Sequence, residues 1–304
     1  MSPSPLNPPP WVSDRGMAAL VALLFAGMGC METDRVLAVQ LDAFPAFSAP
    51  TLVAGLRSDT LDVHDPSLTA DELEIYISSD TNALADIWTS TRTGPNAAWK
   101  PAVIQADLSS PGNDVDPDVS PDGLTIYFSS DRAGDGYHLY VARRAARGQP
   151  WGAPQELTGL GTSTLDMGPT VDPTGLNMVF ASERTTTEAI LYRASRTDPR
   201  GTWADVTPLA EVNSSRQDEN PALFDHGLSL VWSSRGPSNG GTSDLFQVSR
   251  PALDAPFSTT PIALDSLNSA DDWDGDPWLS QDGRHIVFVS DRTTGVSQLY
   301  EAWR

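Results

Sequence analysis

A proline followed thirteen residues later by a serine is the feature that most constrains the fold of this chain. The spacing occurs five times: Pro66 and Ser79, Pro117 and Ser130, Pro169 and Ser182, Pro221 and Ser234, and Pro277 and Ser290. Successive prolines lie 51 to 56 residues apart in the 304-residue chain. A period of this length is typical of propellers and solenoids, in which each repeat is one supersecondary unit. We therefore expect one domain built from five such units.

Each repeat contains further elements at matching positions. Between the proline and the serine lie a turn and a short apolar stretch, as in Ile126-Tyr127-Phe128. An apolar residue and an aromatic follow, and the five pairs are Ile87-Trp88, Leu139-Tyr140, Leu191-Tyr192, Leu245-Phe246 and Leu299-Tyr300. An aromatic closely followed by proline comes next, at Phe47, Trp99, Trp151, Trp203 and Phe257. With the segment at the proline, these elements predict four strands per repeat, which is the content of a β-propeller blade.

The order of these elements predicts how the ring closes. The first element, at Phe47, is of the fourth type, whereas the last, at Tyr300, is of the third type. The N-terminal strand can therefore complete the C-terminal blade, which removes a free sheet edge. We predict an all-β fold, a five-bladed β-propeller of four-stranded antiparallel blades over residues 47 to 304, with the ring closed by the N-terminal strand.

Two residue types have a structural interpretation within the repeat. Glycine stands at the turn, where a positive φ is commonly needed, as Gly123, Gly175, Gly227 and Gly283. Glu72 takes this place in the first repeat and predicts a different turn there. Trp99, Trp151 and Trp203 recur at one position, so we interpret them as packing residues in preference to sugar-stacking platforms.

The repeat resembles that of a known family. The segment from Pro117 to Arg132, which reads PDVSPDGLTIYFSSDR, and the segment from Tyr137 to Tyr140 are similar to the WD40-like propeller repeat of the TolB family and of many bacterial envelope proteins. The resemblance covers roughly residues 47 to 304 and implies a propeller whose relatives are mostly binding or scaffold modules. TolB proteins have six blades and an additional N-terminal domain, whereas the repeats here number five, so no role in a Tol system is carried over.

Polar and acidic residues stand directly before the prolines. The innermost strands of a propeller bring such residues to one mouth of the central channel, where converging carboxylates repel unless cations or hydrogen-bond donors compensate. Two hypotheses remain. Either a Ca²⁺-like cation or the basic tail of a partner is held by Asp65, Asp116, Asn220 and Asp276, or each Asp bonds backbone N–H groups of the neighbouring blade. Apart from that Ca²⁺, no cofactor is expected.

Signals of catalysis are sparse, and no catalytic residue is assigned. The segment from Gly236 to Gly240 has the Gly-x-Ser-x-Gly pattern but lacks the strand and helix that flank a nucleophile elbow. The histidines fall at unlike repeat positions without metal-ligand spacing. We therefore expect a binding or scaffold module of the cell envelope, not an enzyme, with a protein, peptide or glycan held at one face of the ring. The alternative is a carbohydrate-active enzyme, a glycosidase or lyase, whose carboxylates at the channel mouth should break the repeat pattern.

The charge of the chain limits its partners. Nineteen lysines and arginines against forty aspartates and glutamates give a net charge of −21. Nucleic acid and anionic membrane surfaces are disfavoured, because phosphate binding needs the opposite sign. A cationic partner is compatible with this charge, and so is a role in solubility alone. We expect a monomer.

The N-terminal segment has the features of an export signal. An apolar run from Met17 follows Arg15 and ends at Cys30, the single cysteine, and it is too short to span a bilayer. It resembles a bacterial lipoprotein signal, in which the cysteine is lipidated and becomes the mature N-terminus. Gly27 stands where that signal usually has leucine, so cleavage near Gly29 and an uncleaved anchor remain alternatives, and Met17 is an alternative start.

Three regions are expected on this basis: a leader and signal over residues 1–30, a tether over 31–46 and the propeller over 47–304. The expected location is the periplasm or, as a lipoprotein, the outer membrane or cell surface. Contact with the membrane would then be made only through the lipid on Cys30.

Substitution of Cys30 tests the anchor. Cys30→Ser removes the thiol that would carry the lipid, so the protein should move from the membrane fraction to the soluble fraction, because acyl chains contribute about 0.8 kcal/mol of membrane affinity per buried CH₂ group. Cell fractionation with immunoblotting measures the distribution. Unchanged partitioning of the variant would show that Cys30 carries no anchor.

Overall fold

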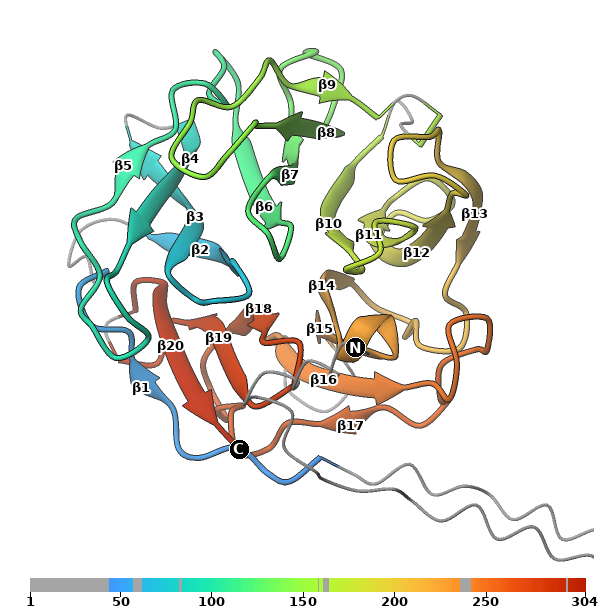
Figure 1. The fold of residues 1–304 in the computed structure, drawn as a ribbon. Coiled ribbons are helices and arrows are strands. Elements are labelled where there is room, and N and C mark those ends of the chain that lie inside the picture. Colours follow the sequence, from blue (N-terminus) through green and yellow to red (C-terminus); the bar gives the residue numbers. More distant parts are fainter. Residues whose placement is uncertain are drawn as a thin grey trace, which may run out of the picture. The chain divides into compact units, whose positions relative to one another are not determined.

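The five repeats form five β-sheets placed around one axis. The computed structural model describes residues 44–56, 62–81, 84–157, 159–160, 164–235, 242–293 and 295–304, all within the unit that begins at Leu41. Each sheet has four antiparallel strands and forms one blade (Figure 1). The predicted all-β, five-bladed propeller is confirmed. Among the described residues, no helix is long and apolar enough to cross a membrane.

The strands take the same places in every blade, from the axis to the rim. The innermost are β2 (Val63–Leu68), β6 (Asp114–Val119), β10 (Asp166–Val171), β14 (Asp218–Phe224) and β18 (Asp274–Leu279). The second are β3 (Glu74–Thr81), β7 (Thr125–Ser130), β11 (Asn177–Ser182), β15 (Ser229–Ser234) and β19 (His285–Ser290). The third are β4 (Leu84–Thr91), β8 (His138–Arg143), β12 (Ile190–Ser195), β16 (Asp244–Ser249) and β20 (Gln298–Trp303). The outermost are β5 (Val103–Ile104), β9 (Gln155–Glu156), β13 (Ala204–Pro208), β17 (Ile262–Ala263) and β1 (Thr51–Leu52), and a 3₁₀ turn, η1 (Asp225–Gly227), links β14 to β15.

The N-terminal strand closes the ring. Blades 1 to 4 follow chain order, β2–β5, β6–β9, β10–β13 and β14–β17, whereas blade 5 contains β18, β19, β20 and β1. Thr51 pairs with Glu301 and Leu52 pairs with Tyr300, so that blue β1 runs beside red β20 in Figure 1. Phe47, just before β1, packs in the same hydrophobic cluster as Phe288. The predicted closure is confirmed.

The predicted leader, its Cys30 and residues 31–43 of the predicted tether lie outside the described residues. Phe44, near the end of that tether, already packs on the propeller. Its ring centroid lies 5.4 Å from that of Phe224, and the Arg304 guanidinium stands 4.1 Å above it. Phe44 therefore packs with the propeller although it was expected to belong to the tether.

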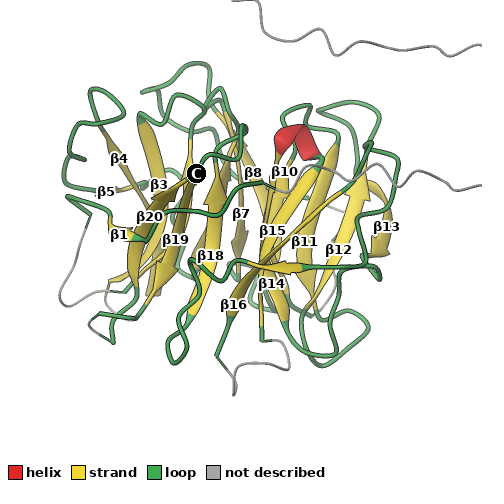
Figure 2. Ribbon diagram, turned by 90° about the horizontal axis from the view of Figure 1, so that it is seen from below, coloured by secondary structure: helices red, strands yellow, loops and turns green. Residues whose placement is uncertain are grey.

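The hydrophobic core is divided among the five blade interfaces. Each of five buried clusters takes its residues from two neighbouring blades. The second strands serve both neighbours: in β7, Tyr127 packs toward blade 3, whereas Ile126 and Phe128 pack toward blade 1. Figure 2 shows the blades from the side, with strands running between two faces that carry the loops. A strand between two blades has no wet face, so its sequence is a nearly continuous apolar run.

The fixed spacing of proline and serine is the length of the hairpin between the first and second strands. In each blade the serine pairs with the residue three before the proline, and the pairs are Val63–Ser79, Asp114–Ser130, Asp166–Ser182, Asp218–Ser234 and Asp274–Ser290. The register shifts at the proline in all five hairpins, which is a β-bulge. Proline donates no backbone hydrogen bond, so within a sheet it fits at such a bulge.

Buried ion pairs hold the hairpins of three blades. Asp114 is completely buried and accepts hydrogen bonds from Ser130 Oγ at 2.6 Å and from Arg132 Nη2 at 2.5 Å. Arg132 also stacks over the rings of Phe128 and Tyr140. Equivalent pairs join Arg184 to Asp166 in blade 3 and Arg292 to Asp274 in blade 5. Loss of one partner would leave a buried charge unpaired, which typically costs about 3–5 kcal/mol.

A second arginine directly follows the third strand of every blade. Its Nε donates at 2.5–2.9 Å to the carbonyl oxygen at the turn between the first two strands, and its guanidinium lies 4.0–4.5 Å above the aromatic ring of the fourth element. The arginine and aromatic pairs are Arg92–Trp99, Arg144–Trp151, Arg196–Trp203, Arg250–Phe257 and Arg304–Phe47. These aromatics are buried, which confirms that Trp99, Trp151 and Trp203 are packing residues.

Glu72 adopts the same turn as the glycines, so the prediction of a different turn was wrong. Its φ is 56°, and its N–H donates to Thr69 O at 2.8 Å just as Gly123 N–H donates to Ser120 O. The left-handed conformation costs an ordinary residue roughly 1–2 kcal/mol. The Glu72 carboxylate offsets that cost by pairing with Arg92 at 3.1 Å and with His285 of blade 5 at 3.1 Å.

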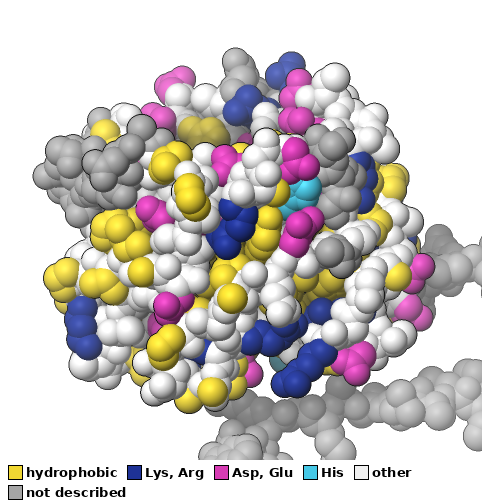
Figure 3. Space-filling view, turned by 90° about the horizontal axis from the view of Figure 1, so that it is seen from above, with side chains coloured by type: hydrophobic (Ala, Val, Ile, Leu, Met, Phe, Trp, Pro, Cys, Tyr) yellow, Lys and Arg dark blue, Asp and Glu magenta, His cyan; other side chains and the backbone are white. Residues whose placement is uncertain are grey.

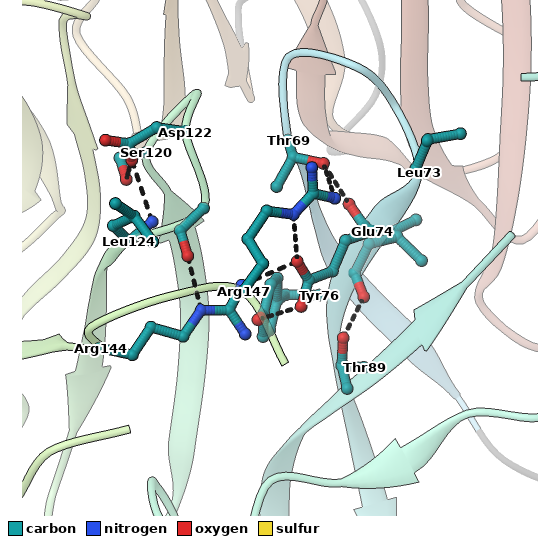
Figure 4. A network of polar contacts seen from close by, with 12 residues as sticks. Thr69, Leu73, Glu74, Tyr76, Thr89, Ser120, Asp122, Leu124, Arg144 and Arg147 are labelled. Carbon is teal, nitrogen blue, oxygen red and sulfur yellow. Dashed lines mark hydrogen bonds and ion pairs between the residues drawn. The ribbon is translucent and has the colours of Figure 1, made fainter. Parts of the chain in front are cut away.

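Charged side chains also join neighbouring blades, as at the network between blades 1 and 2 (Figure 4). Glu74 is buried and accepts from Arg144 Nη2 at 2.7 Å, Arg147 Nε at 3.1 Å and Tyr76 Oη at 2.8 Å. Burial alone would raise the pKa of Glu74, but these donors outweigh it and lower the pKa below its usual value. The carboxylate therefore stays ionised inside the interface.

Removal of the closing strand should destroy the cooperativity of the ring. A chain lacking residues 47–57 loses the pairing of β1 with β20 and the packing of Phe47, so blade 5 exposes the edge of β20. We expect loss of the single cooperative transition in calorimetry and in urea titration. A chain that begins at Phe44 is the matched control. Equal stability of the two chains would rule out the closure as a stabilising element.

Candidate functional site

The residues before the five prolines form a ring around the central channel. Asp65, Asp116, Gly168, Asn220 and Asp276 all line one cavity of about 50 Å³. The structure thus brings together the four residues predicted at the channel mouth. All five have φ between 47° and 59°. Glycine, asparagine and aspartate are the residues that best tolerate this left-handed conformation, so the backbone itself favours an acidic or amide ring here.

The carboxylates of the ring accept hydrogen bonds from the neighbouring blade. Asp65 N–H donates to Asp276 Oδ2 at 3.4 Å, Asp116 N–H to Asp65 Oδ2 at 3.3 Å, and Gly168 N–H to Asp116 Oδ2 at 3.0 Å. Asn220 Nδ2 of blade 4 donates to Asp276 Oδ1 of the neighbouring blade 5. The contacts of the hydrogen-bonding hypothesis are therefore present at Asp65, Asp116 and Asp276.

No group of three or more His, Cys, Asp and Glu side chains suited to a metal ion is found in the described part of the chain. The ring contributes three carboxylates, but each already accepts a backbone N–H. Binding of Ca²⁺ by Asp65, Asp116, Asn220 and Asp276 stays a prediction.

Two polar residues at the mouth interrupt the repeat. His64 and Glu219 directly precede the ring residues of blades 1 and 4, where the other blades have Val115, Met167 and Gly275. Neither residue was predicted as a site residue. The sequence does contain a signal for both, since each replaces an apolar or small residue of the repeat. Departure from the pattern is what was expected of catalytic groups at this mouth.

His64 forms an ion pair with the ring. Its Nδ1 lies 3.2 Å from Asp276 Oδ2, and its side chain keeps 35% of its surface exposed. Burial disfavours the charged imidazole, but the hydrogen bond and the charge of Asp276 outweigh it and raise the pKa of His64 to about 9. His64 is therefore cationic at neutral pH. The Trp273 ring stands edge-on to it, with centroids 6.2 Å apart.

The carboxylates at the mouth have different affinities for protons. Burial and the charge of Asp276 raise the pKa of Asp65 to about 7. Burial and the charge of Asp65 raise the pKa of Asp116 to about 8. Burial, with added repulsion from Asp116 and Asp65, also raises the pKa of Glu219, whose Oε2 accepts from Gln217 Nε2 at 2.5 Å. The mouth therefore combines carboxyl groups that hold a proton near neutral pH with the ion pair of His64 and Asp276.

A second layer of contacts lies one residue beyond the prolines. Ser67 Oγ accepts Val119 N–H at 2.9 Å, Asp118 Oδ2 accepts Val171 N–H at 3.0 Å, and Thr170 Oγ1 accepts Leu223 N–H at 3.1 Å. Burial raises the pKa of Asp118 to about 8 against the effect of that one hydrogen bond. A serine or threonine would make the same contact, so the carboxyl at Asp118 is not required by the repeat.

The charge of the molecule is spread over its surface on the side that Figure 3 shows. Acidic and basic side chains alternate there with hydrophobic ones, and no patch of one sign covers that side. The concentration of carboxyl groups in the channel is therefore a local feature, distinct from the net charge of −21.

Comparison with known proteins gives a distant sequence relative and many similar folds. No protein-family model matches the chain. The curated "Uncharacterized peptidase YuxL" of Bacillus subtilis (strain 168) is 26% identical over 238 residues, which are 76% of this chain and 30% of that protein. The chain thus spans less than a third of the length of this relative.

Among solved structures, the catalytic domain of the GH62 α-L-arabinofuranosidase of Coprinopsis cinerea superposes with a TM-score of 0.59 at 13% identity, covering 85% of this chain and 96% of that one. TolB from Acinetobacter baumannii gives a TM-score of 0.48 at 16% identity, covering 80% of this chain and 54% of that one. Similar propellers also include family 43 and family 117 glycoside hydrolases. These likenesses show the propeller fold, and no family is assigned to the chain.

These comparisons overturn the prediction that the chain is not an enzyme. The prediction treated the repeat as a mark of binding modules, yet propellers of this shape include family 62, 43 and 117 glycoside hydrolases, and the curated relative is named a peptidase. The error has a physical reason, because a propeller fixes a scaffold and leaves the chemistry to side chains placed on it.

The half-buried carboxyl group of Asp118 should make stability depend on pH. Its pKa is about 8 in the folded chain against an ordinary value of 3.8, so its contribution to folding is lost as pH rises from about 4 toward 8. Asp118→Asn keeps the acceptor for Val171 N–H but removes the charge. We expect the variant to unfold at a higher temperature than the parent at pH 9, by roughly 4 °C or more, at about 2–4 °C per kcal/mol.

Calorimetry at pH 4 and pH 9 measures this difference. The exposed Asp271 provides the control Asp271→Asn, which should follow the parent at both pH values. Equal midpoints of Asp118→Asn and the parent at pH 9 would show that Asp118 is not held neutral by burial.

Proposed function

We propose that this chain is an exported enzyme that hydrolyses glycosidic bonds at the mouth of its central channel. The observation that carries the proposal is the presence of Glu219 and His64, two residues that break the repeat, beside carboxyl groups with raised pKa values. Glycoside hydrolysis needs one carboxyl group that donates a proton and one carboxylate that acts as base or nucleophile. Environments that push such pKa values apart identify the two roles.

Glu219 is the acid in this proposal, and Asp276 is the base. Burial keeps a proton on Glu219 at higher pH than usual, so it can protonate the oxygen that leaves the sugar. His64 and Asn220 hold the Asp276 carboxyl group in place at the mouth. It takes a proton from water while that water forms a bond to the anomeric carbon and the bond to the leaving oxygen breaks.

The size of the channel cavity favours water as the nucleophile. About 50 Å³ beside Asp276 is enough for water but not for a sugar ring. The sugar would therefore lie across the mouth, with its anomeric carbon over the channel. A water between acid and base is the arrangement of inverting glycosidases.

Trp273 offers a surface for the sugar at this mouth. Its indole lies directly over Gly275, where an added Cβ would come within 2.4 Å of Trp273 Cζ2. Gly275 therefore permits the position of the ring beside His64. Carbon-rich faces of sugars pack on exposed aromatic rings through apolar contact.

Hydrolysis assays test the proposal. Because similar propellers include an α-L-arabinofuranosidase, the first substrates are arabinoxylan and the 4-nitrophenyl glycosides of arabinofuranose and xylose. Glu219→Gln and Asp276→Asn should each lower kcat by at least about 10²-fold, the usual contribution of an acid or base. The exposed control Asp271→Asn should retain full activity.

Two results would overturn the proposal: cleavage of no glycan in a broad panel, or activity that Glu219→Gln and Asp276→Asn leave intact. Cleavage of peptide substrates would instead favour a peptidase. Proton NMR of the first product separates inversion, which we expect, from retention. Calorimetry of each variant shows that lost activity is not lost folding.

A further inference from the structure

A cavity of about 460 Å³ lies between blades 3 and 4, apart from the channel. Its walls include Val179 of β11, Leu209 after β13 and Leu223 of β14, and Phe257 lies beneath Arg250. Its volume is several times that of the channel cavity and is sufficient for a molecule of the size of a monosaccharide or a capped amino acid.

Arg250 lies in the wall of this cavity with unused donors. It is 6% exposed, and its Nε donates to Gly227 O at 2.9 Å. No further hydrogen bond or ion pair of its guanidinium is found in the described ranges of the chain. Buried arginines normally satisfy their planar fork of donors with carboxylate or other acceptors, so free Nη groups facing a cavity are a binding element for an anion.

The equivalent arginines of the other four blades each have an acceptor at Nη. Arg92 binds Glu72, Arg144 binds Glu74, Arg196 binds the Tyr127 hydroxyl, and Arg304 binds Gln247. Figure 4 shows the filled version of this position at Arg144, where Glu74 and Tyr76 reach toward it. The four equivalent arginines therefore show that an acceptor at Nη is normal at this position, and none is found for Arg250 among the described residues.

The difference lies in blade 3. Asn177 and Val179 stand where blade 1 has Glu74 and Tyr76, and Val179 stands where blade 2 has Tyr127. Replacing a phenol by an isopropyl group removes both volume and an acceptor. Val231 of blade 4 and Val287 of blade 5 are also small, but Phe44 stacks against Arg304 at the interface of blades 4 and 5, and Glu72 pairs with Arg92 at the interface of blades 5 and 1. Among the described residues, the interface of blades 3 and 4 has no tyrosine at this position and no acceptor at Nη of Arg250.

A second guanidinium lines the same cavity. Arg193 donates from Nε to Thr207 Oγ1 at 3.0 Å, its Nη1 lies 3.9 Å from Glu211 Oε1, and 47% of its side chain is exposed. Burial and the charge of Arg193 lower the pKa of Arg250 and outweigh the charges of Asp172, Glu211 and Asp254, which raise it. Asp205 and Asp254 also line the cavity but are exposed, in contrast to the buried Arg250.

We propose that the cavity between blades 3 and 4 binds a small organic carboxylate, with the carboxylate group on Arg250 and Arg193 and the carbon body against Val179, Leu209 and Leu223. The site is separate from the channel mouth and does not depend on glycosidase activity. Sugar acids and acylated amino acids share the required chemistry, so both are tested.

Isothermal titration of the full chain with glucuronate, N-acetyl-leucine and neutral glucose tests the site. We expect at least one carboxylate to bind at least about tenfold more tightly than glucose, the difference typical of a charge-assisted hydrogen bond. Binding of glucuronate alone would identify a sugar-acid site, and binding of N-acetyl-leucine alone a peptide-type site. Binding of neither more tightly than glucose would overturn the proposal.

Val179→Tyr is the decisive variant, because it supplies the phenol that Tyr127 supplies to Arg196. It should abolish carboxylate binding while the unfolding temperature stays the same or rises. Arg193→Gln should weaken binding, whereas Arg216→Gln, an exposed control of equal charge change, should not. Unchanged affinity in Val179→Tyr, with its fold intact by calorimetry, would rule out this cavity as the site.

Discussion

The left-handed residue before each proline is the constraint on which the propeller depends. It produces the bulge in the innermost strand and directs the backbone N–H toward the neighbouring blade. The carboxyl groups of Asp65 and Asp116 accept a backbone N–H from the next blade, and their own N–H groups donate to a carboxyl group of the preceding blade. The same residues that hold the ring together therefore place carboxyl groups around its axis, and the acidity of the channel follows from the way the ring is built.

That origin separates the ring residues, which include Asp276, the base in the proposed reaction, from His64 and Glu219, which interrupt the repeat. The ring carboxylates satisfy backbone donors, and any five-bladed ring with this bulge needs Asp, Asn or Gly there. His64 and Glu219 satisfy no such requirement, since Val115, Met167 and Gly275 fill the same place in the other blades. In a repeat protein such departures are informative, because each residue can be compared with the residues at the four equivalent positions of the other blades.

The same comparison among the blades identifies the cavity beside Arg250 as a departure from the repeat. Five arginines have the same backbone contact and the same aromatic beneath them, and four of them find an acceptor for Nη. The fifth, Arg250, lines a cavity, where Val179 is smaller than Tyr76 and Tyr127 at the equivalent position. A close-packed interior rarely leaves such volume beside a buried guanidinium, and this departure is the basis of the carboxylate site that we propose.

The sequence by itself determined the number of blades, their four strands and the closure of the ring, because periodic spacing and strand order are local properties of the chain. It also located Asp65, Asp116, Asn220 and Asp276 at one mouth, since equivalent positions of a closed ring must converge. Only the tertiary structure decided which of these carboxyl groups hold protons, that His64 pairs with Asp276, and that no acceptor among the described residues bonds Arg250 Nη. Those properties depend on burial and on contacts between residues far apart in the chain, such as His64 and Asp276, which are 212 positions apart, and spacing along the chain carries no record of them. The turn at Glu72 shows the same limit, because its left-handed backbone is supported by His285 from the far end of the sequence.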